Sequence, residues 1–417
     1  MMMHNQSTHS RLLPSSDPAA EQPLSPLPKC ETTSVCKGSA FASFRISRHF
    51  PLLDGLRGLS IVAVIWHHSA DPAGPWGFLG VSLFFTISGF LITTLLLRER
   101  ETTSHINLGA FYARRTLRIF PLYYAVVVLY VLAVLAVDRH SAEGKQFFAN
   151  LPYFVTYTSN MFVDLGNGTR TIFYFAWSLA TEEQFYLLWP ATVRLLPGWR
   201  RPASLMLAMV IISLAGYSLM NAAAPSHPAL LTALASTATV GLGCLAAYVL
   251  HEQGSFRYLY LLLGRRWAVP GLLVLMLYAG IARAPLELSA VLLVSMVVAS
   301  CIRPHSRWEI INHPVLREIG KISYGMYLFH MLCLNVVRRL LPISLQQVTP
   351  VLFLCTLVLT VIVAEISFRT YERWFLRFKD RYRSQNASGA TRTQDLRARS
   401  PNESQIHAPS GPSRHGT

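Results

Sequence analysis

The chain has 417 residues, of which 52% are apolar and only 14% are charged, and its formal net charge is +16. The apolar residues lie in blocks long enough to cross a bilayer, whose hydrocarbon core of about 30 Å needs about 20 apolar residues per helix. Soluble helices carry polar residues on one face, whereas these blocks are apolar nearly all round, which excludes a soluble domain. We therefore predict an all-α, polytopic integral membrane protein.

Basic residues lie in short clusters between the apolar blocks, a distribution typical of the positive-inside rule. No nucleic-acid recognition module interrupts the blocks, so we expect membrane lipids as partners and no nucleic acid. The six cysteines have neither disulfide nor zinc spacing, and no cluster of His, Cys and carboxylate residues has the spacing of metal ligands. We expect packing roles for the cysteines and no bound metal.

Both ends of the chain differ in composition from the apolar blocks. Residues 1–49 are rich in Ser, Pro and His and contain no apolar signal segment, and the chain from about Ser384 contains almost no large apolar residue. Such segments cannot bury enough apolar surface to form a core. We predict disordered cytoplasmic tails at 1–49 and 376–417, which flank one membrane domain at 50–375.

The membrane domain contains about ten predicted spans. They cover residues 56–71, 79–97, 119–137, 174–193, 204–220, 230–250, 268–283, 287–302, 320–337 and 350–371. Arginine-rich loops alternate with basic-poor loops, in which Arg338 and Arg339 are the main exception. Because an even number of spans returns the chain to its starting side, we expect both termini in the cytoplasm. No internal repeat is evident, which disfavours an inverted-repeat transporter.

The first predicted span carries two ionisable residues on one face. Arg57 and His68 are eleven residues apart, which is three helical turns plus about 20°, and about 16 Å along the axis. This separation puts Arg57 near the cytoplasmic surface and His68 close to the bilayer midplane. An intramembrane histidine indicates either a functional site or a residue bonded to a neighbouring helix. His67 points about 80° away, and we expect a structural role for it.

The second predicted span repeats small residues at helical spacing, at Ser82, Thr86, Gly89 and Thr93. Small residues on one stripe let helix backbones approach closely, so we predict helix packing along this stripe. A substrate path lined by Ser82 and Ser88 remains the alternative interpretation of the polar residues in this span.

A cluster of three arginines, Arg114, Arg115 and Arg118, precedes the third predicted span. Guanidinium groups bind phosphates in a bidentate manner, so the cluster fits a phosphate-bearing ligand at the cytoplasmic surface. The alternative is a cluster that only determines topology and meets lipid headgroups.

The fourth predicted span contains two adjacent carboxylates, Glu182 and Glu183, whose directions on a helix diverge by about 100°. We expect one of them to face a polar interior and the other to face a partner or the interface. Their cost inside a membrane favours a functional role or a buried ion pair, and we include Glu182 among the candidate catalytic residues. His330 is a further ionisable residue, within the ninth predicted span.

Five ordered sequence blocks resemble the acyltransferase 3 family, which includes enzymes that O-acetylate bacterial surface polysaccharides. The resemblance covers roughly residues 50–375, and one block alone would not be specific. The blocks are Asp54-Gly-Leu-Arg57 with His68, Phe84-Phe with Ser88-Gly-Phe-Leu-Ile, Phe111-Tyr-Ala-Arg-Arg with Arg118, Trp177-Ser-Leu with Glu182-Glu-Gln-Phe-Tyr, and Ile322-Ser-Tyr with Tyr327-Leu-Phe-His330. One departure is Ser82, where many relatives have Asp.

The resemblance implies a membrane O-acetyltransferase with ten spans in the bacterial inner (cytoplasmic) membrane. It implies an acyl-CoA donor, acetyl-CoA by analogy, and a hydroxyl of a carbohydrate or lipid-linked glycan as the acceptor. It also implies that Arg57 and His68 are the functional pair, and that Arg115 and Arg118 are the basic pair of the family motif.

A mechanism is consistent with these expectations. The arginine cluster would hold the phosphates of acyl-CoA, while His68 meets the thioester either as a general base or as a covalent acyl carrier. A transporter or flippase of a small molecule or lipid-linked sugar is the alternative function. Measured binding of CoA would separate the two functions, because a transporter needs no donor site.

Overall fold

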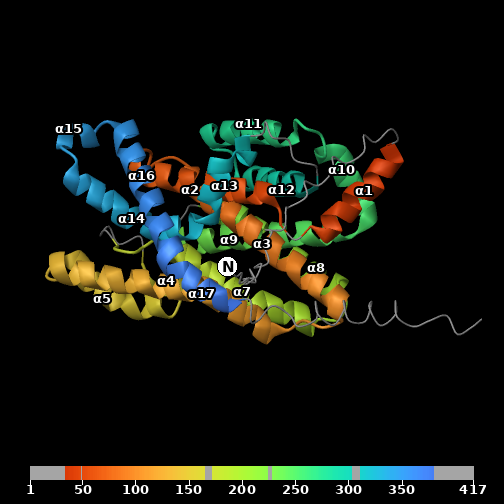
Figure 1. The fold of residues 1–417 in the computed structure, drawn as a ribbon, viewed down its shortest axis with the longest axis horizontal. Helices are drawn as coiled ribbons and strands as arrows, with labels where there is room; N and C mark the ends of the chain where they lie inside the picture. Colours follow the sequence, from red (N-terminus) through yellow and green to blue (C-terminus); the bar gives the residue numbers. More distant parts are fainter. Residues whose placement is uncertain (1–32, 48, 165–170, 224–227, 303–309, 380–417) are drawn as a thin grey trace, which may run out of the picture.

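The computed structural model describes residues 33–47, 49–164, 171–223, 228–302 and 310–379, and its regular secondary structure there is entirely helical (Figure 1). The helices are α1 (Thr33–Ile46), α2 (Pro51–Ser69), α3 (Trp76–Thr103), α4 (Leu108–Val137), α5 (Ala142–Val155), α6 (Ser159–Phe162), α7 (Ala176–Leu195), α8 (Arg200–Ala223), α9 (Pro228–His251), α10 (Gln253–Leu263), α11 (Ala268–Ile281), α12 (Leu286–Ile302), the 3₁₀ turn η1 (Ile310–Asn312), α13 (Pro314–Lys321), α14 (Ser323–Leu340), α15 (Ile343–Gln346), α16 (Thr349–Ser367), the π-helical turn η2 (Phe368–Glu372) and α17 (Arg373–Lys379). The predicted all-α class is confirmed for this part of the chain.

The predicted spans coincide with helices. Each of the ten segments lies mostly within one helix, and 320–337 begins in the last residues of α13 and continues through α14. Five helices are long and apolar enough to cross a bilayer: α3, α4, α8, α9, and α16 with its continuation through α17. The bent pairs α1–α2 and α10–α11, with bends of 70° and 72°, raise the number to seven if each is one span. The described residues therefore support five to seven spans, and the count of ten stays a prediction.

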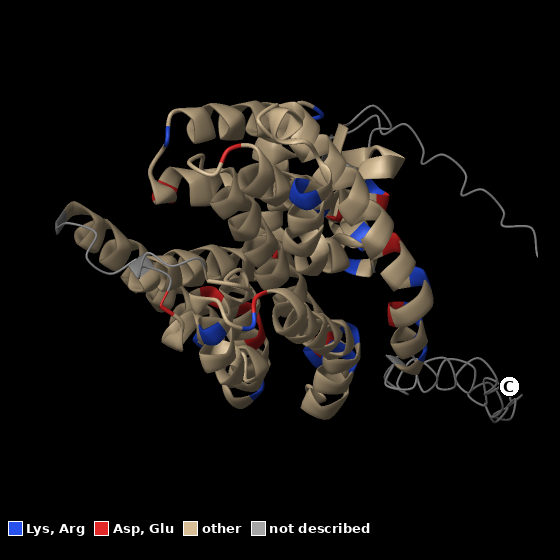
Figure 2. Ribbon diagram, turned by 90° about the vertical axis from the view of Figure 1, so that its left-hand side faces the viewer, with Lys and Arg blue, Asp and Glu red and all other residues tan. Residues whose placement is uncertain are grey.

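Helix α16 shows that the apolar surface of the protein faces outward. Its exposed stripe consists of the large apolar residues Leu354, Val358, Ile362 and Ile366. On the buried stripe, Thr356 and Thr360 each donate a hydrogen bond of 2.7 Å to the carbonyl four residues earlier. Charged residues also occupy few positions along the ribbon (Figure 2). A helix in water has the opposite arrangement, so this surface is suited to lipid.

Helix α1 corrects the predicted disordered tail at 1–49. Residues 33–46 are helical, and the side chain of Phe44 is buried. Arg98 of α3 donates a hydrogen bond of 2.7 Å to the backbone oxygen of Phe44, and its guanidinium lies over the Phe44 ring. The prediction was wrong here because the Ser- and Pro-rich composition upstream hid a short apolar face. The rest of that tail, 1–32, lies outside the described residues.

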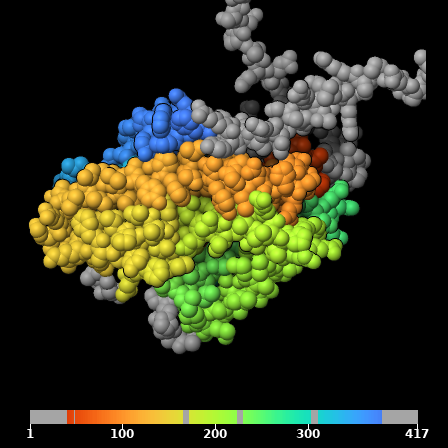
Figure 3. All heavy atoms as spheres, turned by 90° about the horizontal axis from the view of Figure 1, so that it is seen from below, coloured from red at the N-terminus to blue at the C-terminus, as the bar shows by residue number. Residues whose placement is uncertain are grey.

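The C-terminal tail prediction needs a smaller correction. Helix α17 continues to Lys379, into the predicted tail at 376–417, and the remainder of that tail lies outside the described residues. Tyr371 of η2 donates a hydrogen bond of 3.2 Å to the backbone oxygen of Pro121 in α4. Figure 3 shows this C-terminal segment, in blue, lying against the orange segment of α4. Packing against α4 therefore extends the membrane domain beyond its predicted end.

Helix α2 packs against η1 and α13 with no side chain between the backbones. It begins at Pro51, a residue favoured in the first helical turn. A Cβ atom on Gly55 would lie 1.7 Å from the backbone oxygen of Ile311. On the facing helix, a Cβ atom on Gly320 would lie 1.8 Å from the backbone oxygen of Asp54. Both distances are far below van der Waals contact, so only glycine fits either position.

We expect Gly55→Ala to lower the free energy of unfolding by at least about 1–3 kcal/mol, the usual range for overpacking. The clash is with the backbone of Ile311, which cannot rotate away as a side chain can. Gly271→Ala in α11 is the matched control, because nothing lies within 4 Å of its Cβ position. Thermal unfolding of both variants in detergent measures the difference. Equal midpoints would contradict the close packing of α2.

Helices α3 and α9 approach each other through reciprocal glycine contacts at the centre of the fold (Figure 1). A Cβ atom on Gly89 of α3 would lie 2.1 Å from the backbone oxygen of Val240 in α9. A Cβ atom on Gly243 of α9 would lie 2.1 Å from the backbone oxygen of Thr86 in α3. The predicted packing role of the small residues in the second span is therefore confirmed.

Candidate active site

His68 lies in the last turn of α2, which begins at Pro51 and ends at Ser69. Tyr174, just before α7, brings its hydroxyl to 2.8 Å from His68 Nδ1. The ring of His67 meets the His68 ring edge-on, with centroids 4.8 Å apart. One hydrogen bond and one ring contact therefore restrain the His68 imidazole from two sides.

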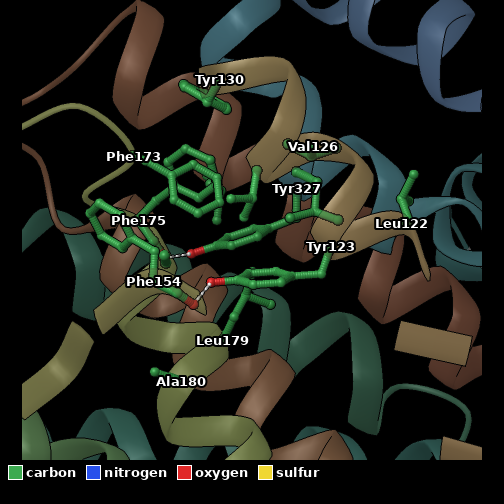
Figure 4. Close-up of a cluster of buried hydrophobic side chains, with 14 of the residues drawn as sticks. Leu122, Tyr123, Val126, Tyr130, Phe154, Phe173, Phe175, Leu179, Ala180 and Tyr327 are labelled. Carbon is green, nitrogen blue, oxygen red and sulfur yellow. Dashed lines mark hydrogen bonds between the residues drawn. The ribbon is translucent and has the colours of Figure 1, made fainter. Parts of the chain in front are cut away.

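A second histidine, His330 of α14, stacks on His68 with ring centroids 5.1 Å apart and planes inclined by 29°. His330 Nδ1 lies 2.5 Å from the backbone oxygen of Tyr327. The Tyr327 hydroxyl lies 2.6 Å from Ser178 Oγ and donates to the backbone oxygen of Phe175 at 3.2 Å (Figure 4). These contacts join α2, α14 and the start of α7 around the two histidines.

A polar stripe runs along α7 away from the histidines. It consists of Ser178, Glu182 and Tyr186 on α7, each four residues after the one before, together with Tyr174 in the turn just before the helix. On the helix, each four-residue step turns by about 40°, so the three α7 residues stay within about 80° of one another and extend about 12 Å along the axis. The stripe lies between Tyr174, which contacts His68, and Glu182, which contacts Arg115.

Glu182 is the centre of a hydrogen-bond network on this stripe. Its Oε1 accepts hydrogen bonds from Ser88 Oγ at 2.6 Å and from the Tyr186 hydroxyl. Arg115 Nη2 lies 3.5 Å from the same oxygen, and the Arg115 guanidinium lies 3.5 Å from the centroid of the Tyr186 ring. Hydrogen bonds to a charged acceptor are stronger than neutral ones, so this network fixes Arg115 relative to α7.

Two arginines of the sequence cluster, Arg115 and Arg118, form a basic group with Arg57. Arg57 and Arg115 lie close enough to Arg118 for their charges to interact, so α2 and α4 contribute to one basic group. Within the described residues, neither Arg57 nor Arg118 has a carboxylate oxygen within 4.0 Å. Arg114 lies 3.9 Å from Glu99 at the end of α3.

Glu183 lies in different surroundings from Glu182. It acts electrostatically on three tyrosines, Tyr123, Tyr157 and Tyr324. Burial raises the pKa of Tyr157, in the turn after α5, well above its ordinary value, so its phenol stays protonated. The predicted divergence of the two adjacent carboxylates is confirmed, and only Glu182 belongs to the stripe.

A cavity of about 570 Å³ opens beside Tyr174. Its walls are the ends of α4 and α14, the start of α5 and residues 171–175. The charged residues on these walls are Asp138, Glu143, Arg338 and Arg339. Ligand pockets for small molecules are typically about 300–1,000 Å³. Tyr174 lines the cavity and contacts His68, and Phe175 lines it and contacts His330, so the cavity lies beside the stacked histidines.

Sequence reasoning missed three members of the site, Tyr174, Ser178 and Tyr186. Their four-residue spacing with Glu182 was the available signal, but the aromatic and apolar residues between them concealed it. Ser82, the departure from the family pattern, is buried and is not among the residues that line the cavity. Among the described residues, no group of three or more His, Cys, Asp or Glu side chains is arranged to hold a metal ion.

Comparison with known proteins gives consistent matches. The acyltransferase domain family matches residues 50–368. A peptidoglycan O-acetyltransferase, OatA, of Listeria monocytogenes is 29% identical over 381 residues, which cover 81% of this chain and 59% of the relative. A putative O-acetyltransferase of Staphylococcus aureus strain COL is 28% identical over 380 residues, with the same two coverages. The O-acetyltransferase OatA of Staphylococcus aureus strain NCTC 8325 is 28% identical over 352 residues, which cover 78% and 57%.

The chain spans about three fifths of the length of these curated relatives. No solved structure matches it significantly. The family match covers well over half of the chain and includes the histidines, the arginines and the α7 stripe. The resemblance carried by the five sequence blocks is therefore confirmed, and the chain belongs to the acyltransferase domain family.

Proposed function

We propose that this chain is a membrane O-acetyltransferase that moves an acetyl group from acetyl-CoA to a hydroxyl of a carbohydrate or lipid-linked glycan. The observation that carries the proposal is the polar stripe of α7, which connects a basic group to a pair of stacked histidines. The relatives, named as O-acetyltransferases, support the same reaction class. Membership of an acyltransferase family favours group transfer over the transporter or flippase alternative.

The arginine end of the site fits the nucleotide of the donor. Arg57 and Arg118 have no carboxylate within ion-pair distance in the described residues, so their guanidinium groups are available to phosphates. Arg115 lies 3.5 Å from Glu182, and its guanidinium has further N–H donors for a phosphate. About 16 Å along α2 separates Arg57 from His68. An acyl-CoA, with phosphates at one end and a thioester at the other, reaches both ends at once.

The cavity beside Tyr174 is the proposed acceptor site, because Tyr174 lines it and contacts His68, at the end of α2 away from Arg57. As a general base, neutral His68 takes the proton of the acceptor hydroxyl while the hydroxyl oxygen attacks the thioester carbon. The C–S bond breaks, and CoA leaves as a thiolate. As an acyl carrier, an imidazole nitrogen of His68 attacks first and the hydroxyl receives the acetyl group in a second step. The Tyr174 hydrogen bond orients the imidazole in both routes.

The two ends of the site belong, in this proposal, to opposite sides of the bacterial inner (cytoplasmic) membrane. With ten spans and both termini in the cytoplasm, the arginine end faces the cytoplasm and the cavity faces the other side. Acyl-CoA is a cytoplasmic donor, whereas a surface glycan is reached from outside. The acetyl group would then cross the membrane through the protein while CoA stays on the cytoplasmic side.

Two measurements test the proposed function. Membranes that contain the protein should cleave acetyl-CoA when an acceptor glycan is present. Mass spectrometry of cell-envelope glycans should show O-acetyl groups that a deletion strain loses and a complemented strain regains. Identical glycans in the two strains, together with no cleavage of acetyl-CoA, would overturn the proposal.

The arginines provide a sharper test of donor binding. We expect Arg115→Gln to raise the KM for acetyl-CoA about tenfold or more, because a hydrogen bond to a charged group contributes about 1.5–3 kcal/mol. Arg114→Gln is the matched control, since Arg114 pairs with Glu99 at a long distance, and such pairs contribute about 0–1 kcal/mol. Both KM values are measured at matched membrane expression. An unchanged KM for Arg115→Gln would favour a cluster that only determines topology.

A further inference from the structure

We infer that His330 is a positioning residue that holds the imidazole of His68 in its reactive orientation. The inference rests on the proposed function, in which His68 meets the thioester. His330 does not line the cavity, and its side chain is only 1% exposed. It therefore acts on the reaction through His68, and not by contact with the acceptor.

The orientation of the His330 ring is itself fixed. Its Nδ1 lies 2.5 Å from the backbone oxygen of Tyr327, and a carbonyl oxygen only accepts hydrogen bonds, so Nδ1 carries a hydrogen. The ring of Phe175 meets the His330 ring at 5.0 Å with an interplanar angle of 62°. Figure 4 shows that Phe175 and Tyr327 come from different helical segments and converge on one cluster. The imidazole of His330 is therefore held in one plane.

The fixed ring of His330 restrains the plane of the His68 imidazole. The two rings are stacked at 5.1 Å and inclined by 29°, whereas His67 and Tyr174 meet the His68 ring edge-on, at 68° and 84°. The stack therefore covers one face of His68, while the other contacts restrain its edges. Reaction rates are sensitive to such placement, since a shift of about 1 Å in a reacting group can lower the rate about 10²-fold.

The remaining nitrogen of His330 shows what the imidazole contributes. Nε2 is buried and has no hydrogen-bond partner among the described residues. A buried polar atom without a partner destabilises a protein, so a phenyl ring at this position would be more stable. A phenyl ring would also stack on His68, but it has no Nδ1–H to bond to Tyr327 and fix its plane. The imidazole is thus explained by positioning and not by stability.

Two substitutions test the inference on the full-length protein in membranes. His330→Leu removes the stacking ring, and we expect it to lower kcat about 10²-fold with the KM for acetyl-CoA unchanged. His330→Phe keeps a ring without the hydrogen bond, and we expect a smaller loss of about threefold to tenfold. The thermal midpoint of His330→Phe should be equal to or higher than that of wild type. Activity that falls while stability is kept distinguishes positioning from a structural role.

A chemical probe gives a readout that needs no turnover. Diethyl pyrocarbonate acylates histidine, and mass spectrometry of peptides measures its rate at His68. We expect this rate in His330→Phe to stay close to wild type and to rise several-fold in His330→Leu, because one face of His68 is uncovered. If the labelling rate at His68 changes as expected but the wild-type protein transfers no acetyl group, the proposed function is refuted and the positioning of His68 by His330 is not. The inference would be overturned if His330→Leu kept the wild-type kcat and the wild-type labelling rate at His68. It would also be overturned if the loss of activity were explained entirely by weaker CoA binding.

Discussion

Replacing His68 with Ala should lower acetyl transfer about 10²–10⁴-fold, the usual contribution of a general base, while donor binding largely survives. His68 is the ionisable group that meets both the stacked ring of His330 and the hydroxyl of Tyr174, and Tyr174 also lines the cavity. The arginine end lies about 16 Å away along α2, so the substitution leaves the phosphate contacts in place. The loss should therefore appear in kcat and not in the binding of a CoA analogue.

The neighbouring histidine is the matched control for this prediction. His67→Ala removes an imidazole from the same turn, but His67 packs over Gly77 and touches only an edge of His68. We expect its effect on turnover to be mild, with both variants compared at matched membrane expression. Near-wild-type turnover of His68→Ala would refute the mechanism. Equal damage from His67→Ala would refute the assignment of the functional face.

Glu182→Ala should have the second largest effect, a fall in kcat/KM for acetyl-CoA of about 10- to 100-fold. The carboxylate accepts hydrogen bonds from Ser88 and Tyr186 and lies near Arg115. Loss of such charge-assisted hydrogen bonds costs about 1.5–3 kcal/mol each, which is reduced here because the Arg115 contact is partly exposed. Without Glu182, the Arg115 guanidinium is no longer fixed over the Tyr186 ring.

One further variant separates charge from shape at this position, and a second variant elsewhere serves as its control. Glu182→Gln keeps the acceptor oxygen for Ser88 but removes the charge, and we expect an intermediate loss of kcat/KM with little change in the thermal midpoint. Glu365→Gln breaks an exposed pair with Arg369 on α16 and serves as the control for a lost carboxylate. If Glu182→Ala behaves like Glu365→Gln, the α7 stripe does not support donor binding.

The fold was largely predictable because hydrophobic blocks determine where helices form. The ten predicted segments fall on helices. In the bilayer core no water is present to hydrogen-bond the backbone, so a single apolar segment of this length satisfies its own backbone groups by forming a helix. The helix around Phe44 was missed because its stability comes from contacts across the fold, including the hydrogen bond from Arg98. The composition of a short segment does not indicate a contact with a residue more than 50 positions away in the chain.

The site was predictable where residues share one helix and unpredictable where several helices meet. The common face of Arg57 and His68 follows from helical pitch alone. The stack of His330 on His68 depends on how α14 packs against α2, which no linear spacing reports. The contact of Arg114 with Glu99 also depends on how α3 and α4 pack, because adjacent helical residues such as Arg114 and Arg115 point about 100° apart.

Arg57 and His68 lie on one continuous helix, α2, so the distance between the two ends of the proposed donor site is fixed at about 16 Å. A proposed donor would then be selected by its length as well as by its charge. An acetyl thioester that lacks the nucleotide would contact only one end at a time and would lose the advantage of binding both. A longer acyl chain would compete with the proposed acceptor for the cavity of about 570 Å³ beside Tyr174. The fixed spacing on α2 would thus favour donors of one arm length, and the shared cavity would favour short acyl chains.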